Sequence, residues 1–315
     1  MSEAKNETSE KQNETIDLGE VVDQLCHPEG MMIRRVGLVH CAEPLPSRDV
    51  VIETVELLRS VLFPGYFGIA ELRPQTVRYH IGHTLDMIQR RLEVQIHRGL
   101  AFACAERTDC EGLEQQAERF TATFLSRLPG IQRQLARDVQ AAYEGDPALT
   151  SGDEAIFCYP GIQAITNFRI ANALHQLQIP LLPRMITEHA HSVTGIDIHP
   201  GATIGDGVFI DHGTGVVVGE TCIIGDRVRI YQGVTLGAKS FPLDADGNPV
   251  KGIARHPIIE DDVTIYSGAT ILGRVTIGRG SMIGGNVWLT REVAPNSRIT
   301  TQPPQAEHFE NGGGI

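Results

Sequence analysis

The chain has 315 residues, which is long enough for one or two domains with a substantial core. It carries 27 basic and 39 acidic residues and a net charge of −12, so it lacks the positive charge with which proteins bind nucleic acids or anionic membranes. No apolar run approaches the roughly 20 residues of a membrane-spanning helix. We therefore expect neither nucleic-acid nor membrane partners.

The N-terminal residues 1–15 are polar and lack the apolar stretch of a signal peptide, which predicts a disordered tail. Six cysteines are scattered without CxxC pairs, a pattern typical of free thiols in a reducing cytoplasm. We therefore predict a cytoplasmic protein. Of the 33 glycines, most lie beyond residue 194, which indicates that the two halves of the chain are built differently.

Helical periodicity dominates residues 16–194, which we predict to form an all-helical domain. Stripes of apolar residues predict helices over 47–62 and 77–96, and a further helical stretch from 113 to about 139. Pro129-Gly130 is expected to interrupt the last of these. Two shorter helices should open near Pro160 and Pro183.

From Ile198 onward the apolar spacing changes to six residues, which fits neither an α-helix nor an ordinary strand. The recurring positions form two blocks: Ile198, Ile204, Ile210, Val216, Cys222, Val228 and Val234, then Ile259, Ile265, Ile271, Ile277, Ile283 and Leu289. Short strands separated by tight turns explain this period, and they predict a parallel β-helix over 195–299 with three hexads per coil. The alternative, a β-sandwich, does not keep one fixed period.

Two segments of this half do not fit the six-residue frame. Residues 238–257 must leave the coil as an extruded loop, which is where function tends to lie on a regular solenoid. Residues 300–315 contain Pro303-Pro304 and three consecutive glycines, which predicts a flexible C-terminal tail.

Five short blocks of the β-helical half occur in a distinctive order: Asp197-Ile198-His199-Pro200, Ile210-Asp211-His212-Gly213-Thr214-Gly215, Val217-Val218-Gly219-Glu220-Thr221, Val234-Thr235-Leu236-Gly237 and Arg255-His256-Pro257. This ordered set resembles the serine O-acetyltransferases in their longer bacterial form. The resemblance implies an α+β fold in which the helical domain precedes a left-handed parallel β-helix. It also implies a homotrimer or a dimer of trimers, with acetyl-CoA as co-substrate and no permanently bound cofactor.

A hydroxyl group is a poor nucleophile at neutral pH, so its acylation needs a positioned base. His212 is the best candidate, because it lies in a glycine-containing turn and histidine titrates near neutrality. Asp197 lies about one coil earlier and can orient the ring, as in a catalytic dyad. The spacing by itself is equally compatible with a histidine that only caps a corner of the β-helix.

The resemblance also implies how L-serine is held. Asp146 and Asp211 match the positions that bind its ammonium group, and Arg255 and His256 match those at its carboxylate and hydroxyl. The residue types suit an amino acid. By type alone, however, the two aspartates are also compatible with turn residues and Arg255 with a loop charge.

Further implied contacts involve acetyl-CoA and two other partners. Gly237, Ala238, Ser267 and Gly285 match positions along the coenzyme. L-cysteine is expected as a feedback inhibitor, because it differs from serine only by a thiol. The tail ends in Ile315, and the resemblance implies that such a tail inserts into O-acetylserine sulfhydrylase, whose site captures a carboxylate.

The sequence therefore predicts transfer of acetyl from acetyl-CoA to L-serine in cysteine biosynthesis. One alternative is an acetyltransferase for another hydroxyl acceptor such as a sugar, and a second is a non-catalytic partner of cysteine synthase. A metal site is a further alternative, because several histidines cluster in this half. We expect no metal, because His189 and His191 precede the coil and His199 lies on a different corner from His212.

Overall fold

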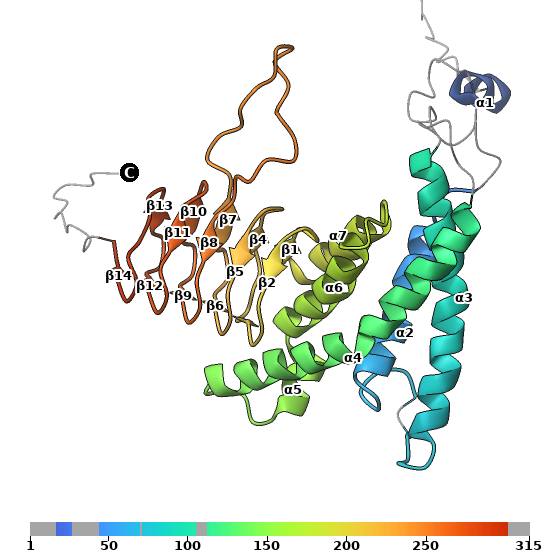
Figure 1. Cartoon of the computed structure of the whole chain (residues 1–315), viewed down its shortest axis with the longest axis horizontal. Helices are drawn as coiled ribbons and strands as arrows, with labels where there is room; N and C mark the ends of the chain where they lie inside the picture. Colours follow the sequence, from blue (N-terminus) through green and yellow to red (C-terminus); the bar gives the residue numbers. More distant parts are fainter. Residues whose placement is uncertain (1–16, 27–43, 70, 105–111, 302–315) are drawn as a thin grey trace, which may run out of the picture.

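The computed structural model describes residues 17–26, 44–69, 71–104 and 112–301. Helices form one end of the molecule, and a β-helix extends away from them along the long axis (Figure 1). The helices are α1 (Leu18–Cys26), α2 (Arg48–Leu62), α3 (Val77–Cys104), α4 (Leu113–Gly145), α5 (Gly152–Cys158), α6 (Pro160–His175) and α7 (Leu182–Thr194). None of the helices in these ranges is long and apolar enough to cross a membrane.

The helical half follows its sequence signals closely. Ser47 caps α2, because its hydroxyl accepts a hydrogen bond from the Val50 amide at 3.4 Å. Pro160 occupies the first turn of α6, and Gly195 ends α7 in the left-handed region at φ 71°. The expected interruption at Pro129 is wrong, since α4 continues through it to Gly145. Burial of the apolar stripe on both sides of Pro129 outweighs the roughly 3 kcal/mol that a proline costs inside a helix, and the buried side chains are Phe124, Leu128, Ile131 and Leu135.

The C-terminal half has the parallel coils that the hexads predict, and it is the left-handed β-helix that the family resemblance implies. Its short strands pair in parallel into three sheets, which form the three sides of a prism. The first sheet contains β1 (Asp197–Ile198), β4 (Val217–Val218), β7 (Thr235–Gly237), β10 (Thr270–Leu272) and β13 (Trp288–Leu289). The second contains β2 (Thr203–Ile204), β5 (Ile223–Ile224), β8 (Ile258–Ile259) and β11 (Thr276–Ile277). The third contains β3 (Phe209–Ile210), β6 (Arg229–Ile230), β9 (Thr264–Ile265), β12 (Met282–Ile283) and β14 (Arg298–Ile299).

The register corrects the hexad series after Ile210. Ile198 pairs with Val218, twenty positions later, whereas Val218 pairs with Leu236, eighteen positions later. The first coil therefore holds two extra residues, which lie in the turn after β3. The paired positions are Val218, Ile224, Ile230 and Leu236, and not Val216, Cys222, Val228 and Val234. Both sets are buried, so apolarity does not distinguish them.

Three corners join the sides of the prism, and we name them by their residues. The histidine corner (211–216, 231–234, 266–269 and 284–287) leads from the third sheet to the first. The arginine corner (199–202, 219–222 and 254–257) leads from the first sheet to the second. The aspartate corner (205–208, 225–228, 260–263 and 278–281) leads from the second sheet to the third.

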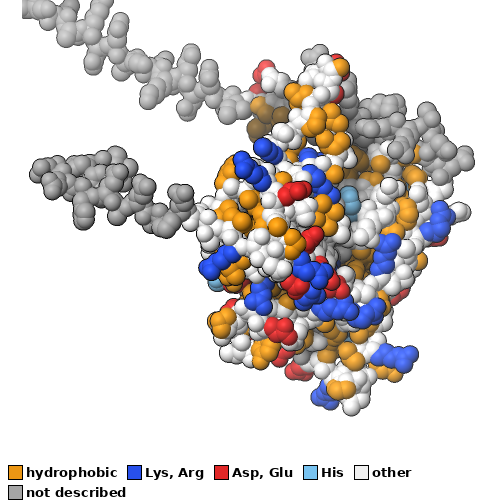
Figure 2. All heavy atoms as spheres, turned by 60° about the vertical axis from the view of Figure 1, so that its left-hand side comes forward, with side chains coloured by type: hydrophobic (Ala, Val, Ile, Leu, Met, Phe, Trp, Pro, Cys, Tyr) orange, Lys and Arg blue, Asp and Glu red, His pale blue; other side chains and the backbone are white. Residues whose placement is uncertain are grey.

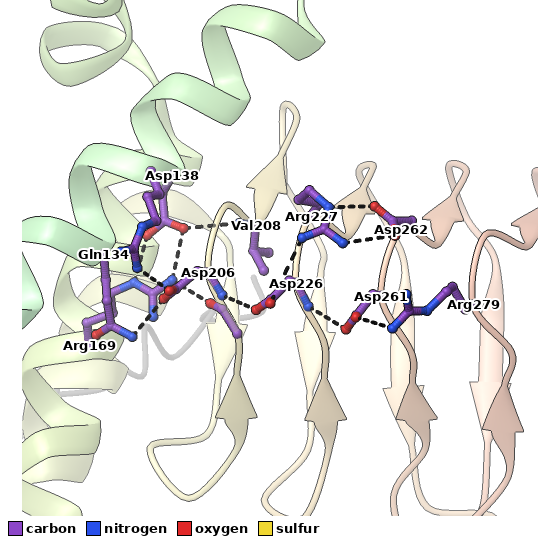
Figure 3. Close-up of polar contacts among 12 residues, drawn as sticks. Gln134, Asp138, Arg169, Asp206, Val208, Asp226, Arg227, Asp261, Asp262 and Arg279 are labelled. Carbon is purple, nitrogen blue, oxygen red and sulfur yellow. Dashed lines mark hydrogen bonds and ion pairs between the residues drawn. The ribbon is translucent and has the colours of Figure 1, made fainter.

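The aspartate corner carries a ladder of carboxylates that ties successive coils together (Figure 3). Asp226 accepts a hydrogen bond from the Asp206 amide at 2.8 Å, and Asp261 accepts one from the Asp226 amide at 3.0 Å. The ladder continues into the helices through Gln134, whose amide donates to Asp206. On the face of the molecule shown in Figure 2, acidic and basic side chains are intermixed.

A buried ion pair joins the helices to the first coil. Arg169 on α6 donates to both carboxylate oxygens of Asp138 on α4, at 2.7 and 2.9 Å, and the two side chains are 3% and 0% exposed. The guanidinium also donates to the Gly205 carbonyl, and Asp138 accepts from the Val208 amide. The two halves therefore meet through a hydrogen-bonded contact as well as through apolar packing.

The extruded loop is confirmed, because β7 ends at Gly237 and β8 begins at Ile258. The prediction of free thiols holds for Cys158 and Cys222, but Cys104 is disulfide-bonded. The Cys104 bond does not follow from the sequence, because it does not belong to a CxxC pair.

Candidate active site

The turn that carries His212 projects from the histidine corner. His212, Gly213 and Gly215 all have positive φ, at 57°, 81° and 80°. The Gly215 amide donates to the Gly195 carbonyl at 2.8 Å, which ties the turn to the end of α7. The two extra residues of the first coil lie here, and they leave the His212 side chain 70% exposed. The register shift therefore coincides with the position at which the imidazole is exposed to solvent.

Two carboxylates interact electrostatically with this imidazole. Nδ1 of His212 lies 3.8 Å from Oδ1 of Asp211, whose side chain is only 14% exposed. Burial raises the pKa of Asp211, an effect that His212 opposes and Asp146 reinforces. Hydrogen bonds from the Tyr159 hydroxyl and the Ala148 amide lower the pKa of Asp146. Asp146 and Asp211 thus lie near His212 and near each other, which is an environment suited to a cationic group.

Two glycines bring Asp146 to this corner. A Cβ atom on Gly145 would lie 2.7 Å from the Phe209 ring, and one on Gly161 would lie 2.1 Å from the Ile210 carbonyl oxygen. The end of α4 and the start of α6 therefore rest directly on β3, immediately before Asp211. Only glycine permits this approach.

The expected partner of His212, Asp197, is not joined to it in this structure. Asp197 begins β1 in the first sheet and pairs in register with Val217. Among the described side chains, the ion pair of His212 is with Asp211. The role of Asp197 therefore stays a prediction.

The other residues that the sequence predicts to bind the substrate lie at the arginine corner. Arg255 forms an ion pair with Glu220 at 2.7 Å, and its Nε is buried without a hydrogen-bond partner. His256 accepts a hydrogen bond at Nδ1 from the Thr221 amide at 3.0 Å, so the ring proton of its neutral form lies on Nε2. Burial and the Arg255 charge lower the pKa of His256. A Cβ on Gly219 would lie 2.1 Å from the imidazole, so this ring also depends on a glycine.

The histidine and arginine corners lie at opposite ends of the first sheet. One side of the prism separates them, and the six-residue repeat that forms a side spans roughly 20 Å when extended. The structure therefore brings Asp146, Asp211 and His212 together and holds Arg255 and His256 elsewhere.

The predicted coenzyme positions divide in the same way. Ser267 and Gly285 lie on successive coils of the histidine corner, where a Cβ on Gly285 would be 3.2 Å from the Ser267 carbonyl oxygen. Gly237 ends β7 and Ala238 follows it, at the opposite end of the first sheet. Ile315 lies outside the described residues.

Sequence reasoning missed Tyr159, which donates a hydrogen bond to Asp146 at 2.6 Å. Its only local signal is the following Pro160, which marks a helix start. The stacked rings of Tyr231 and Tyr266 at the histidine corner, with centroids 5.2 Å apart, were also missed.

Two features lie apart from this chemistry. A cavity of about 680 Å³ between α4, α6 and β2 contains none of the predicted site residues. Within the ranges that the structure describes, no three His, Cys, Asp or Glu residues are grouped as metal ligands.

Comparisons with known proteins agree with this architecture. The family model described as "Bacterial transferase hexapeptide (six repeats)" matches residues 256–291. The plasmid serine acetyltransferase of Synechococcus elongatus is 57% identical over 276 residues, which cover 86% of each chain. Among solved structures, Entamoeba histolytica serine acetyltransferase 1 in complex with L-cysteine has a TM-score of 0.69 and 36% identity, over 83% of this chain and 90% of that one. A serine acetyltransferase from Brucella abortus in complex with coenzyme A has a TM-score of 0.53 and 26% identity, over 80% and 93% of the two chains. With this fold, this histidine turn and a relative so similar over most of its length, the chain belongs to the serine acetyltransferase family.

Proposed function

We propose that this enzyme transfers the acetyl group of acetyl-CoA to the hydroxyl of L-serine, giving O-acetyl-L-serine and coenzyme A in cysteine biosynthesis. The observation that carries the proposal is the His212 turn with its two carboxylates, in a chain of this family. Acetyl-CoA acts as the co-substrate, in keeping with the coenzyme A complex of the Brucella abortus enzyme. The chain needs no permanently bound cofactor for this chemistry.

In the proposed reaction, neutral His212 takes the serine hydroxyl proton as the oxygen attacks the thioester carbonyl carbon. A C–O bond forms and the carbonyl becomes a tetrahedral oxyanion, which backbone amides stabilise. Collapse breaks the C–S bond, and the proton held by His212 passes to the departing thiolate. The imidazole returns to its neutral form, so no external acid or base is consumed.

The substrate contacts divide by charge. Asp146 and Asp211 receive the ammonium group of serine, beside the base that activates its hydroxyl. Arg255 receives the carboxylate, and His256 donates through Nε2 near the hydroxyl. A sugar offers neither of these charges, which favours an amino acid over a sugar as acceptor.

We further propose that each site forms between two copies of the chain. The histidine corner of one copy would face the arginine corner of its neighbour, because one prism side separates these corners within a chain. Gly237, Ala238, Ser267 and Gly285 would then line the coenzyme from both sides. In a closed ring of three chains, every histidine corner would face the arginine corner of a neighbour. Pairing of two such trimers is compatible with this arrangement.

The proposed roles of Asp197 and Asp211 are separable by experiment. We propose Asp197 as the residue that orients the imidazole, whereas Asp211 binds the substrate. Asp197→Asn should lower kcat more than it changes the KM for serine. Asp211→Asn should chiefly raise that KM. The reverse pattern would exchange the two roles.

L-cysteine is the proposed feedback inhibitor, competitive with serine. It carries the same ammonium and carboxylate groups, and related enzymes from Entamoeba histolytica have been solved in complex with cysteine. Calorimetry should detect binding at millimolar cysteine or below. Inhibition competitive only with acetyl-CoA would indicate a separate site.

The partner interaction and the location stay predictions. We propose that Ile315 docks into O-acetylserine sulfhydrylase, and that deletion of Ile315 abolishes binding to that enzyme while acetyltransferase activity is kept. Unchanged affinity would exclude the tail as the docking element. The proposed location is the cytoplasm.

The direct test of the reaction is thiol release from acetyl-CoA in the presence of serine, other amino acids and sugars. Serine should give by far the highest kcat/KM. A sugar preferred over serine would overturn the proposal, and so would the absence of turnover with every acceptor, which would favour a non-catalytic partner of cysteine synthase.

A further inference from the structure

Tyr159 contacts Asp146, one of the two carboxylates proposed to bind the substrate, and the sequence does not predict this contact. Its hydroxyl donates to Oδ2 of Asp146 at 2.6 Å, while the Ala148 amide donates to Oδ1 at 2.8 Å. We propose that Tyr159 is a positioning residue, which fixes the Asp146 carboxylate beside Asp211 and His212 so that it receives the ammonium group of the amino-acid substrate. This inference rests on the proposed function and adds a determinant of amino-acid recognition.

The backbone of Tyr159 is unusually well fixed for a residue between helices. Its amide donates to the Ala155 carbonyl at the end of α5, and its carbonyl accepts from the Gln163 amide at the start of α6. It is thus the C-cap of one helix and the N-cap of the next. Pro160 follows it and restricts its backbone to an extended conformation, observed at φ −84° and ψ 120°. The ring therefore starts from a backbone that has little freedom to move.

The same element is anchored to the catalytic turn. Gly161, two residues after Tyr159, is buried and rests on the carbonyl of Ile210, which immediately precedes Asp211. At the other end of the contact, Asp146 caps α4 through its amide, which donates to Ala142. Helices α4 and α6 thus hold the two partners of the hydrogen bond separately against β3. The bond then fixes the remaining freedom of the carboxylate about its side-chain torsions.

The electrostatics show what the bond does to each partner. The Tyr159 hydroxyl is the largest cause that lowers the pKa of Asp146, and the bond to Asp146 is the largest cause that raises the pKa of Tyr159. Glu154 and Asp211 act on Tyr159 in the same direction, so the phenol stays a neutral donor. Each oxygen of Asp146 accepts one bond from the protein and keeps a lone pair for an ammonium donor.

The test compares Tyr159→Phe with Tyr143→Phe, an exposed tyrosine on α4, in the full-length enzyme. Tyr159→Phe should raise the KM for serine about tenfold, because a hydrogen bond to a charged group is lost, while kcat and the KM for acetyl-CoA change less than about twofold. The affinity for L-cysteine, measured by calorimetry, should fall by a similar factor. Tyr143→Phe should leave all of these values unchanged.

Asp146→Asn separates failure of this inference from failure of the proposed function. If Asp146→Asn raises the KM for serine and Tyr159→Phe does not, the positioning role is overturned and the ammonium site stands. If neither variant changes that KM, Asp146 does not bind the substrate, and both statements fail. Equal losses for serine and acetyl-CoA in Tyr159→Phe, with a lower melting temperature, would show that Tyr159 is merely structural. In the double variant, the loss should not exceed that of Asp146→Asn alone.

Discussion

Replacement of Gly161 by alanine tests whether the approach of α6 to β3 sets the geometry of the site. The backbone of Gly161 does not have positive φ, so alanine is allowed there in conformation and its effect is steric. The added Cβ would lie 2.1 Å from the Ile210 carbonyl oxygen and 3.1 Å from its carbon. Nonbonded heavy atoms prefer about 3.5 Å, so α6 has to withdraw from β3 by about 1 Å.

A withdrawal of this size moves Tyr159, at the start of α6, and displaces its hydroxyl from the Asp146 carboxylate. Misplacement by 1 Å is enough to lower turnover about 10²-fold, so kcat/KM for serine should fall by about that factor. Overpacking should also lower the stability of the fold by about 1–3 kcal/mol. The assay is thiol release from acetyl-CoA, with a thermal melt to confirm that the variant is folded.

Gly130→Ala is the matched control. Gly130 lies inside α4, and its added Cβ would meet nothing nearer than the Arg133 guanidinium at 4.0 Å. Alanine there should gain up to about 1 kcal/mol of helix stability and leave kcat/KM unchanged. If Gly161→Ala is folded and as active as Gly130→Ala, the contact between α6 and β3 does not set the site geometry.

Three further outcomes follow from other parts of the structure. Asp138→Ala should lower the free energy of unfolding by about 3–5 kcal/mol in urea denaturation, because it leaves buried Arg169 unpaired; a loss below about 1 kcal/mol would refute the importance of this pair. A thiol reagent at pH 8 should modify exposed Cys158 and spare Cys222, whose pKa burial raises to about 12, and peptide mapping that finds Cys222 modified would contradict this. Burial, assisted by nearby cations, lowers the pKa of His199 from 6.5 to about 4, so the stability that its neutral form contributes is lost as the pH falls through this window. The His199→Asn variant should therefore lose less stability than the wild type between pH 6.5 and 4. Equal losses in the two proteins would refute the assignment.

The helical half shows where sequence signals suffice and where they fail. Apolar stripes and the capping residue Ser47 locate α2 and α3 correctly, because these signals are local. The break predicted at Pro129 does not occur, because the free energy that a proline costs locally is outweighed by apolar burial against other helices. That burial depends on tertiary contacts, which no local pattern contains.

The β-helix was predictable as an architecture but not in its register. Six-residue periodicity identifies the coils, because each side of the prism contributes one six-residue repeat and three sides complete a coil. The two residues inserted between Ile210 and Val218 shift the frame by the same distance that separates two inward-facing positions. Because Val216 and Val218 are equally buried, apolarity hides the insertion.

The site divides in the same way between local and long-range information. The turn around His212 is visible in the sequence, because its glycines and the neighbouring aspartate lie within a few residues. The Tyr159–Asp146 contact depends on how α5 and α6 return to the end of α4, and the sequence does not specify this. The separation of Arg255 from His212 is likewise a property of the coil, because the order of the motifs does not show which corner of the prism each one occupies.

Complementation between two inactive variants tests most directly the claim that the acetyltransferase site forms between copies of the chain. His212→Ala and Arg255→Ala should each reduce serine-dependent thiol release at least about 10²-fold as pure proteins. If each site takes its histidine corner from one copy and its arginine corner from the neighbour, co-expressed equal amounts should regain about a quarter of the wild-type sites. Mixed oligomers in which activity stays at the level of the pure variants would contradict the shared site.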